Sequence, residues 1–230
     1  MTVNEHGQPV GPPLGVWSAP PFPPGEALVG RTVRLEVLDP QSHGPGLWEA
    51  LRDAPASTWT YMSFGPFHDY DEFEGALQGI LAPADWIPYA AIVDDRPVGF
   101  ASYLRIEPHA GSIEIGSITW SPPMQKTTAS TEALFLMLDH VFDLGYRRCE
   151  WKCDDLNGPS RAAALRLGFT YEGTFRKATH YKGRNRDTAW YSMVDDEWPD
   201  VRRSFHDWLS EANFDEKGRQ MRSLREMMAR

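Results

Sequence analysis

A run of small hydroxyl residues stands where a predicted helix begins, and such a site could bind an anion. Thr127, Thr128, Ser130 and Thr131 follow the apolar segment SIEIGSITW and two prolines, and they precede apolar residues at helical spacing. The first turn of a helix has unpaired N–H groups and the positive end of the helix dipole, which together favour phosphate. Hydroxyl residues at a helix start are also common caps, so an anion site and a simple cap both stay open.

A glutamate within SIEIGSITW could act as a general base. Ile113 and Ile115 lie on one face of this predicted strand, whereas the apolar residues beyond Gly116–Ser117 fall in the opposite phase. A strand keeps one face buried through such a change only by inserting a residue, so we predict a β-bulge there, with the glycine easing the backbone; an irregular strand without a bulge is the alternative. Glu114 would face away from the packed side, where it can accept a proton or be solvated or ion-paired.

The elements that must position these residues follow from periodicity and turn signals. Strand–helix–strand connections in the second half favour parallel pairing and right-handed crossovers. The sequence therefore predicts an α/β fold, with a mixed sheet of about seven strands that is parallel in its middle and flanked by helices. The expected strands are 32–39, 89–93, 98–105, 112–120, 149–154 and two that flank the turn 182–187; the expected helices are 47–53, 69–81, 125–145, 157–169 and a segment from about 197.

The two ends of the chain differ in composition from its middle. Residues 1–29 contain seven of the 19 prolines, which favours extended, polyproline II-like chain over a helix or a ladder. Trp17 and Phe22 could fix this arm on the surface, and disorder is the alternative. We expect a proline-rich arm over 1–29, one folded domain over 30–197 and a helical extension over 198–230.

Composition narrows the class of protein. The 230 residues are 41% hydrophobic, enough for one substantial core. No segment has the roughly 18 to 20 apolar residues of a membrane span, and the first residues lack signal-peptide features, so we expect a cytoplasmic protein without membrane association. The net charge of -9 argues against nucleic acid as a partner and suits a cationic substrate, although solubility alone explains it. Cys149 and Cys153 indicate two buried thiols, and no metal site is expected.

The segments SIEIGSITW, QKTTASTEA and NGPSRAAALRLGF together resemble the acyl-CoA-binding core of GNAT acetyltransferases, in the branch similar to the RimJ/RimL N-terminal acetyltransferases. The resemblance extends over about residues 30–195. Asn157, Ser160 and Gly168–Phe169 match the Asn-x-x-Ser helix that ends in Gly-Phe in this branch.

The phosphate motif of the family departs from its usual form in this chain. The family has Gln or Arg, then Gly, then Gly or Ala, and the matching residues are Gln125, Thr128 and Ser130. Glycines allow close approach of the backbone to phosphate, whereas the hydroxyls here could contact phosphate themselves.

The resemblance implies that the strands 112–120 and 149–154 separate at their carboxyl ends, so that pantetheine inserts between them. It implies acetyl-CoA as the cofactor and an amine as the acceptor, and Glu114 is the candidate base because of its position before the bulge. Ser160 would protonate the departing thiolate, because the tyrosine of many relatives is replaced by Ala164, and Asn157 would orient cofactor or water; for both residues a role in the helix start is the alternative. The implied cofactor contacts are Ile118, Thr119, Trp120, Gln125, Lys126, Thr127, Thr128, Ala129, Ser130, Asn157 and Ser160; the implied acceptor contacts are Trp59, Tyr61, Phe64, His180 and Tyr181.

The predicted activity is acetyl transfer from acetyl-CoA to an amine, by direct attack in a ternary complex. The acceptor would be a protein N-terminus, a peptide or a small amine, and a homodimer is left open. Because Thr128, Ser130 and Ala164 depart from the family pattern, a non-catalytic acyl-CoA-binding regulatory module is the alternative. For the aromatic acceptor residues, core packing is the alternative.

Overall fold

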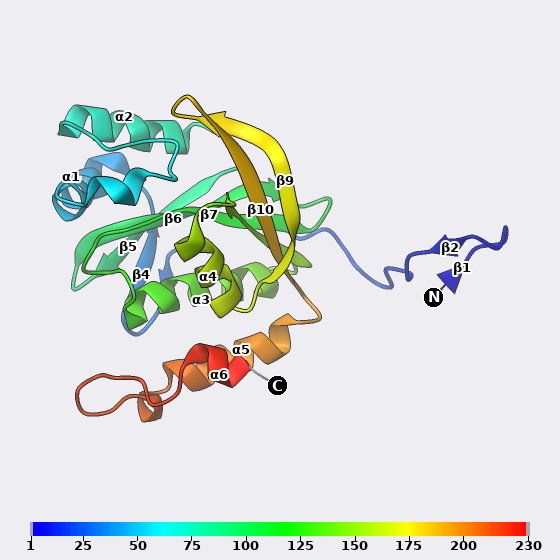
Figure 1. The fold of residues 1–230 in the computed structure, drawn as a ribbon. Coiled ribbons are helices and arrows are strands. Elements are labelled where there is room, and N and C mark those ends of the chain that lie inside the picture. Colours follow the sequence, from blue (N-terminus) through cyan, green and yellow to red (C-terminus); the bar gives the residue numbers. More distant parts are fainter. Residues whose placement is uncertain (1, 229–230) are drawn as a thin grey trace.

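A computed structural model describes residues 2–228, and its centre is one eight-stranded sheet (Figure 1). The order across the sheet is β3-β4-β5-β6-β7-β8-β10-β9, with β7 and β8 parallel and the other described neighbours antiparallel. About seven strands were expected, and the eighth is β3, which lies in the predicted arm. The strands are β3 (Leu28–Val29), β4 (Arg34–Val37), β5 (Ile87–Val93), β6 (Arg96–Glu107), β7 (Ser112–Trp120), β8 (Arg148–Asp154), β9 (Thr170–Tyr181) and β10 (Arg184–Val194).

Helices cover both faces of the sheet (Figure 1). The first two lie over the β4–β6 half of one face, and the later helices lie against the other face. These layers confirm the mixed α/β architecture with flanking helices. The helices are α1 (Pro40–Leu51), α2 (Tyr70–Leu81), α3 (Thr128–Asp143), α4 (Gly158–Arg166), α5 (Trp198–Leu209) and α6 (Leu224–Met228), with short 3₁₀ turns η1 (Ala56–Trp59) and η2 (Glu211–Asn213).

Two hydrophobic cores follow from these layers. The larger one joins the sheet to α3, α4 and α5, and it contains Ile113, Ile115 and both cysteines. The smaller one lies between the sheet and the helices α1 and α2, and includes Phe100 of β6. Because side chains alternate along a strand, the even-numbered residues at the start of β7 and along β8 point away from α3.

The predicted β-bulge is present in β7. Phe100 pairs with Thr119 and Ser102 pairs with Gly116, so three steps of β7 match two steps of β6. The residue at positive φ is Ser117, at 50°, and not the glycine as expected. Gly116 has a different role, because a Cβ there would stand 2.6 Å from a leucine side chain of β6. The bulge therefore combines a left-handed serine with a glycine required by close packing.

The first helix begins earlier than predicted. It starts at Pro40 rather than near Leu47, because the Asp39 carboxylate accepts hydrogen bonds from the amides of Gln41 and Ser42, at 3.2 and 3.3 Å. Two glycines and a proline within its first turns concealed this start in the sequence.

The last hairpin has a tighter turn than predicted. Only Lys182 and Gly183 lie between β9 and β10, at φ values of 49° and 69°, whereas a turn over 182–187 was expected. Positive φ at both central residues is typical of a two-residue type I′ turn, which continues the twist of the two strands. The strands consequently extend to the tip of the hairpin.

The N-terminal segment projects from the sheet and contains a short ladder (Figure 1). Thr2–Val3 (β1) pairs with Pro9–Val10 (β2), so the expectation of chain without a ladder was wrong there. Nearer the sheet, the Tyr146 hydroxyl donates to the Pro21 carbonyl at 3.1 Å, and Arg147 lies 5.7 Å from the ring centroid of Trp17. Within residues 2–228, no helix has the length and apolar character needed to cross a bilayer.

Candidate active site

The parallel strands β7 and β8 pair over only three residue pairs, from Ser112 with Arg148 to Glu114 with Glu150. Beyond them β7 stays paired with β6, and β8 stays paired with β10. The two strands therefore diverge toward their carboxyl ends, and the facing backbone groups are not paired with each other. The separation implied by the resemblance is present, and an extended amide-containing arm could pair with these groups.

Glu114 stands at the last pair before the strands diverge. Its side chain is 3% exposed, and its Oε2 accepts a hydrogen bond from Arg105 Nη1 at 2.6 Å and lies 2.9 Å from Lys152 Nζ. Its Oε1 accepts no hydrogen bond from a described residue, and it lies 3.2 Å from the place where a Cβ of Gly116 would stand. The missing side chain of Gly116 thus leaves room for the unbonded oxygen. The ion pair and the free acceptor oxygen coexist in one carboxylate.

Lys152 fixes this carboxylate from the neighbouring strand. Its Nζ lies 2.6 Å from Glu150 Oε2 and 3.9 Å from the ring centroid of Trp190, and its side chain is 7% exposed. Burial alone would raise the pKa of Glu150, but hydrogen bonds from Lys152 and Arg148 outweigh burial and lower that pKa. The lysine therefore lies between two carboxylates and an indole face, each of which attracts a cation.

The start of α3 offers backbone donors rather than hydroxyls. Thr127 Oγ1 accepts from the Ser130 amide at 3.2 Å, and Ser130 Oγ donates to the Thr127 carbonyl at 2.9 Å, so neither hydroxyl is free of the cap. The amides of Lys126, Thr128 and Ala129 have no partner among residues 2–228. Three free N–H groups at a helix start fit a diphosphate. Cap and anion site are therefore both compatible with this segment.

The remaining predicted cofactor contacts on this side border the end of β7. Gln125 Nε2 donates to the Trp120 carbonyl at 3.0 Å, which ties the loop to the last residue of the strand. Thr119 is buried, and its hydroxyl donates to the Ser117 carbonyl at 3.3 Å. Ile118 is half-buried and packs against the larger core. The backbones of Ile118, Thr119 and Trp120 lie on the part of β7 that is no longer paired with β8.

Ser160 and Asn157 lie at the start of α4, next to the carboxyl end of β8. Asn157 Oδ1 accepts from the Ser160 amide at 3.1 Å. The asparagine therefore caps the helix, which was the alternative to a role in orienting cofactor or water. Trp151 Nε1 donates to Ser160 Oγ at 3.0 Å. This bond uses a lone pair of the oxygen and leaves the hydroxyl proton to be donated. Ala164 is fully buried.

The two cysteines are buried free thiols, as predicted. Burial raises the pKa of Cys149 strongly, and it also raises the pKa of Cys153. The thiolate is the nucleophilic form of cysteine, so neither side chain is activated for attack. Within residues 2–228, no three His, Cys, Asp or Glu side chains group in a way that could hold a metal ion.

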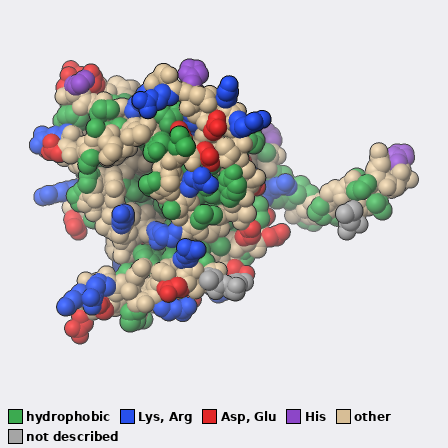
Figure 2. Space-filling model, in the orientation of Figure 1, with side chains coloured by type: hydrophobic (Ala, Val, Ile, Leu, Met, Phe, Trp, Pro, Cys, Tyr) green, Lys and Arg blue, Asp and Glu red, His purple; other side chains and the backbone are tan. Residues whose placement is uncertain are grey.

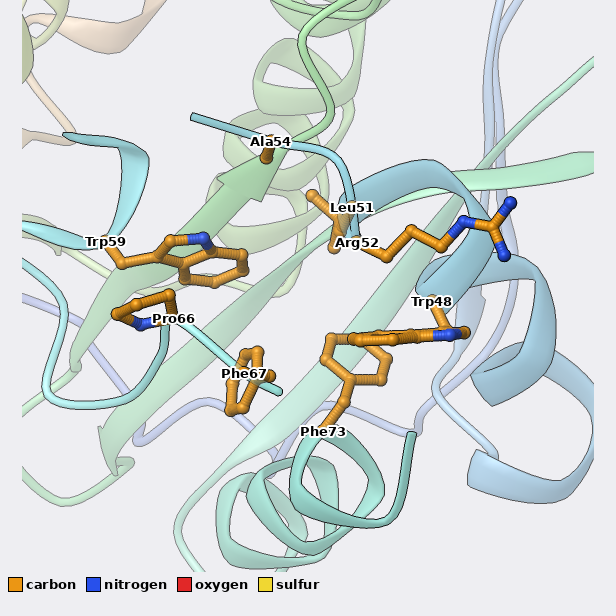
Figure 3. Close-up of a pocket in the computed structure, with 8 residues that line it drawn as sticks. All are labelled: Trp48, Leu51, Arg52, Ala54, Trp59, Pro66, Phe67 and Phe73. Atoms are coloured by element: carbon orange, nitrogen blue, oxygen red, sulfur yellow. The ribbon is translucent and has the colours of Figure 1, made fainter. Parts of the chain in front are cut away.

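Trp59 lies in the smaller core rather than on an open surface (Figure 3). Its side chain is 3% exposed, and its ring centroid lies 6.1 Å from that of Phe64 and 5.1 Å from that of Phe67. The indole borders a cavity of about 30 Å³, which admits no more than a water molecule. The side chain of Trp59 is therefore packed in the core, which was the alternative to contact with the acceptor. The cavity is lined by Trp48, Leu51, Arg52, Ala54, Trp59, Pro66, Phe67 and Phe73.

The tip of the β9–β10 hairpin is fixed to the loop that contains Trp59. Lys182 Nζ donates to the carbonyl oxygens of Trp59 and Phe64, at 2.7 and 3.0 Å. The Tyr181 hydroxyl donates to Asp154 Oδ2 at 2.6 Å, and burial, together with this carboxylate, raises the pKa of Tyr181 to about 12. These bonds hold the hairpin over the face of the sheet that carries Glu114.

Two predicted acceptor contacts have no side-chain hydrogen bond among the described residues: Tyr61 is half-buried and His180 is exposed. Sequence reasoning missed Arg105, Lys152 and Lys182. Lys152 had a readable signal, because it alternates with Cys149, Trp151 and Cys153 and must face away from their core; the contacts of Lys182 are too distant in sequence to have one.

Comparison with known proteins places this geometry in context. Residues 34–170 match the family model described as Acetyltransferase (GNAT) domain. None of the curated proteins matches the sequence.

Several solved structures share the fold. A GCN5-related N-acetyltransferase from Brucella melitensis is 42% identical, with a TM-score of 0.90 over 94% of this chain and 99% of that one. A probable acetyltransferase of the GNAT family from Chromobacterium violaceum is 41% identical, with a TM-score of 0.79 over 84% and 98% of the two chains. The ribosomal L7/L12 alpha-N-protein acetyltransferase RimL in complex with coenzyme A is 23% identical, with a TM-score of 0.60 over 74% and 98%, which indicates a shared fold.

Proposed function

Because the chain belongs to the GNAT family of acetyltransferases, whose reaction is acetyl transfer from acetyl-CoA, we propose that it acetylates an amine by direct attack in a ternary complex. The observation that carries the proposal is the divergence of β7 from β8 directly after Glu114. A buried carboxylate would then stand where an acyl group held between the strands meets an acceptor from the opposite face.

The free amides at the start of α3 would hold the diphosphate of acetyl-CoA, and the facing edges of β7 and β8 would hold its pantetheine. When bound, acetyl-CoA supplies an activated acyl thioester. The N–H groups of Ser117 and Ile118 lie in the bulge, where they can stabilise negative charge that develops on a carbonyl oxygen. Donors of this kind typically contribute about 10²- to 10³-fold to a rate.

Glu114 would accept the proton of the acceptor ammonium through Oε1, directly or through a water molecule. A positioned base of this kind contributes about 10²- to 10⁴-fold. Arg105 and Lys152 hold Oε2, so the orientation of the carboxylate does not have to be established at each turnover. Ser160 would donate its hydroxyl proton to the departing sulfur, with Trp151 fixing the oxygen. The raised pKa values of both cysteines support transfer without a covalent enzyme intermediate.

The acceptor class stays open between a protein N-terminus, a peptide and a small amine. The shared fold with RimL supports the first of these, since that enzyme is described as an alpha-N-protein acetyltransferase. A cytoplasmic location, a homodimer and the absence of a nucleic-acid partner stay predictions.

The test is release of free thiol from acetyl-CoA, measured with a panel of peptides and small amines, with acetylation of the acceptor identified by mass spectrometry. We expect turnover on at least one class of amine and none with alcohols. Tight binding of coenzyme A without turnover on any amine would instead favour the non-catalytic acyl-CoA-binding module.

A further inference from the structure

The β9–β10 hairpin carries a charge opposite to that of the protein. The chain has a net charge of -9, yet residues 175–187 contain the five cations Arg176, Lys177, Lys182, Arg184 and Arg186 and one acid, Asp187. Lysine and arginine side chains gather over this hairpin at the top of the space-filling view (Figure 2). The acidity of the whole chain suggested a cationic substrate, but the surface beside the acceptor face is basic.

None of these five cations has an acidic partner among residues 2–228, and four of them have no hydrogen-bonded side chain either. Lys182 is engaged with two carbonyl oxygens, but Arg176, Lys177, Arg184 and Arg186 form no ion pair within the described chain. Arg186 lies 5.9 Å from the ring centroid of Tyr181, and its Nε is buried without a hydrogen-bond partner. By contrast, most arginines elsewhere in the fold, such as Arg148, pair with carboxylates. The hairpin therefore has unsatisfied capacity for anions.

A shallow, open groove lies on this hairpin. It is lined by an aromatic ring, two cations, an asparagine and an aspartate that already accepts hydrogen bonds within the hairpin. Asp187 Oδ1 accepts from the Lys177 amide at 2.7 Å and from Asn185 Nδ2 at 3.2 Å, so the acid is part of the frame of the groove. Phe175 is 56% exposed. The lining residues are Phe175, Arg176, Lys177, Asn185 and Asp187.

Contacts connect this groove to the proposed base. The Phe175 ring lies 4.6 Å from that of Trp190, Trp190 carries Lys152 on its face at 3.9 Å, and Lys152 contacts Glu114 at 2.9 Å. A peptide whose amine reaches Glu114 would therefore extend toward the hairpin. Because a strand advances about 3.3 Å per residue, several residues of an extended acceptor would lie beside the free cations.

From these observations we infer that the acceptor is a polypeptide whose N-terminal amine is followed closely by acidic residues, which the free cations of the hairpin bind. The inference rests on the proposed function and specifies its acceptor. A single small amine would leave most of this row of charges unused, and an acidic segment would match it in sign and in length.

The test compares three peptides with the same N-terminal residues, followed by residues that are all Glu, all Gln or all Lys. We expect the full-length protein to acetylate the Glu peptide with a kcat/KM roughly tenfold above that of the Gln peptide, since each exposed ion pair contributes modestly, and the Lys peptide least. The preference should decline as salt rises above about 0.1 M, where exposed charges more than about 10 Å apart are largely screened.

A charge-matched pair of variants locates the effect. Arg176→Gln, Lys177→Gln and Arg184→Gln together should remove the preference and leave the KM for acetyl-CoA and the rate on the Gln peptide unchanged. The control, Arg96→Gln, Lys217→Gln and Arg225→Gln, removes as many exposed cations elsewhere and should keep the preference.

Equal kcat/KM on the three peptides, or a preference that survives in the hairpin variant, would overturn the inference while leaving acetyl transfer intact. Equal rates together with binding of a single-stranded RNA oligonucleotide that the hairpin variant loses would reassign the surface to nucleic acid. Turnover on no peptide or amine would contradict both the inference and the proposed function.

Discussion

Arg105 and Lys152 hold one oxygen of Glu114 and leave the other unbonded, and this division determines what a substitution there should do. The placement of Glu114 could be predicted from the sequence, because alternation along a strand is a local property. Alternation also gives the face of Lys152, but the contact of either cation with Glu114 could not be predicted, because Lys152 lies on another strand and Arg105 is brought there by the pairing of β6 with β7. The capping bond of Asn157 is also local in sequence, and it was anticipated as an alternative.

Glu114→Gln tests the base at this scale. The amide keeps the shape of the side chain and can still accept from both cations, but it cannot take a proton, so the rate at saturating substrate should fall about 100-fold or more. Coenzyme A affinity should stay as in the parent, which a direct binding titration would check.

Glu150→Gln is the control, because Glu150 contacts the same lysine from the last paired residue of β8. We expect its rate to stay within a few-fold of the parent. Equal rates for the parent and Glu114→Gln across pH would remove Glu114 from the mechanism.

Glu172 gives a prediction about acid stability. Hydrogen bonds from Arg148, with a smaller one from Ser192, lower the pKa of Glu172 from 4.5 to about 2. A lowered pKa in the folded state means that the stabilisation is complete above about pH 4.5 and is lost as the pH falls toward 2. The side chain is 40% exposed, so solvent screening reduces the contribution to about 1 kcal/mol.

Glu172→Gln should therefore lower the free energy of unfolding by about 1 kcal/mol at pH 7 and leave it unchanged near pH 2, as measured by urea unfolding over a pH series. Glu107→Gln, at an exposed residue of β6 without an ion pair in the described chain, is the matched control and should have no effect at either pH. A loss of the same size at both ends of the series would show that the difference does not come from titration.

At the scale of single elements, the bulge in β7 links a sequence pattern to the opening of the sheet. The change of apolar phase was sufficient to predict an inserted residue. The sequence pattern could not tell which residue adopts the left-handed conformation. Gly116 is needed instead for close packing against β6, and that contact depends on the neighbouring strand. The tight turn of the last hairpin was missed for a similar reason, since its basic residues suggested a loop although two of them continue the strand.

Two substitutions at Ser117 separate backbone strain from side-chain contacts. Ser117→Gly should keep activity and at least the parent stability, because glycine adopts a φ of 50° without penalty. Ser117→Val should lower the free energy of unfolding by about 1 to 2 kcal/mol and weaken coenzyme A binding, because a β-branched residue is strongly disfavoured at positive φ. Urea unfolding and a binding titration measure both quantities; a valine variant as stable as the glycine one would show that the left-handed residue is not required there.

At the scale of the whole molecule, the mixed sheet with a parallel pair in its middle and flanking helices followed from sequence pattern, but the limits of the folded unit did not. Leu28 of β3 is buried and pairs with Leu35, so sheet structure begins inside the segment assigned to the arm. The two residues of β3 are too few to give a periodic pattern, and they form a strand because they pair with the edge of β4. The boundaries at 29 and 197 stay predictions.

Two N-terminal deletions test where the folded unit begins. Removal of residues 2–15 should leave the melting temperature and activity unchanged, because this part contains the projecting ladder. Removal of residues 2–29 should lower the melting temperature by at least about 3 °C, because it deletes β3 and the bond between Tyr146 and Pro21. Calorimetry of both variants measures this, and identical melting curves would mean that the arm contributes nothing to the fold.

The bonds of Lys182 have a consequence for access to the carboxylate. Phe64 lies 6.2 Å from Phe100 of β6, Lys182 joins the carbonyl of Phe64 to the hairpin, and the hairpin returns to the sheet through β10. These contacts link the loop after Trp59, the hairpin and the sheet into a closed circuit, and we expect the acceptor to reach Glu114 through it. A lysine held within a rigid domain has backbone on both sides and cannot be threaded through a ring, whereas a loose chain end can. Discrimination between terminal and internal amines would then arise from topology, before any side chain of the acceptor is recognised.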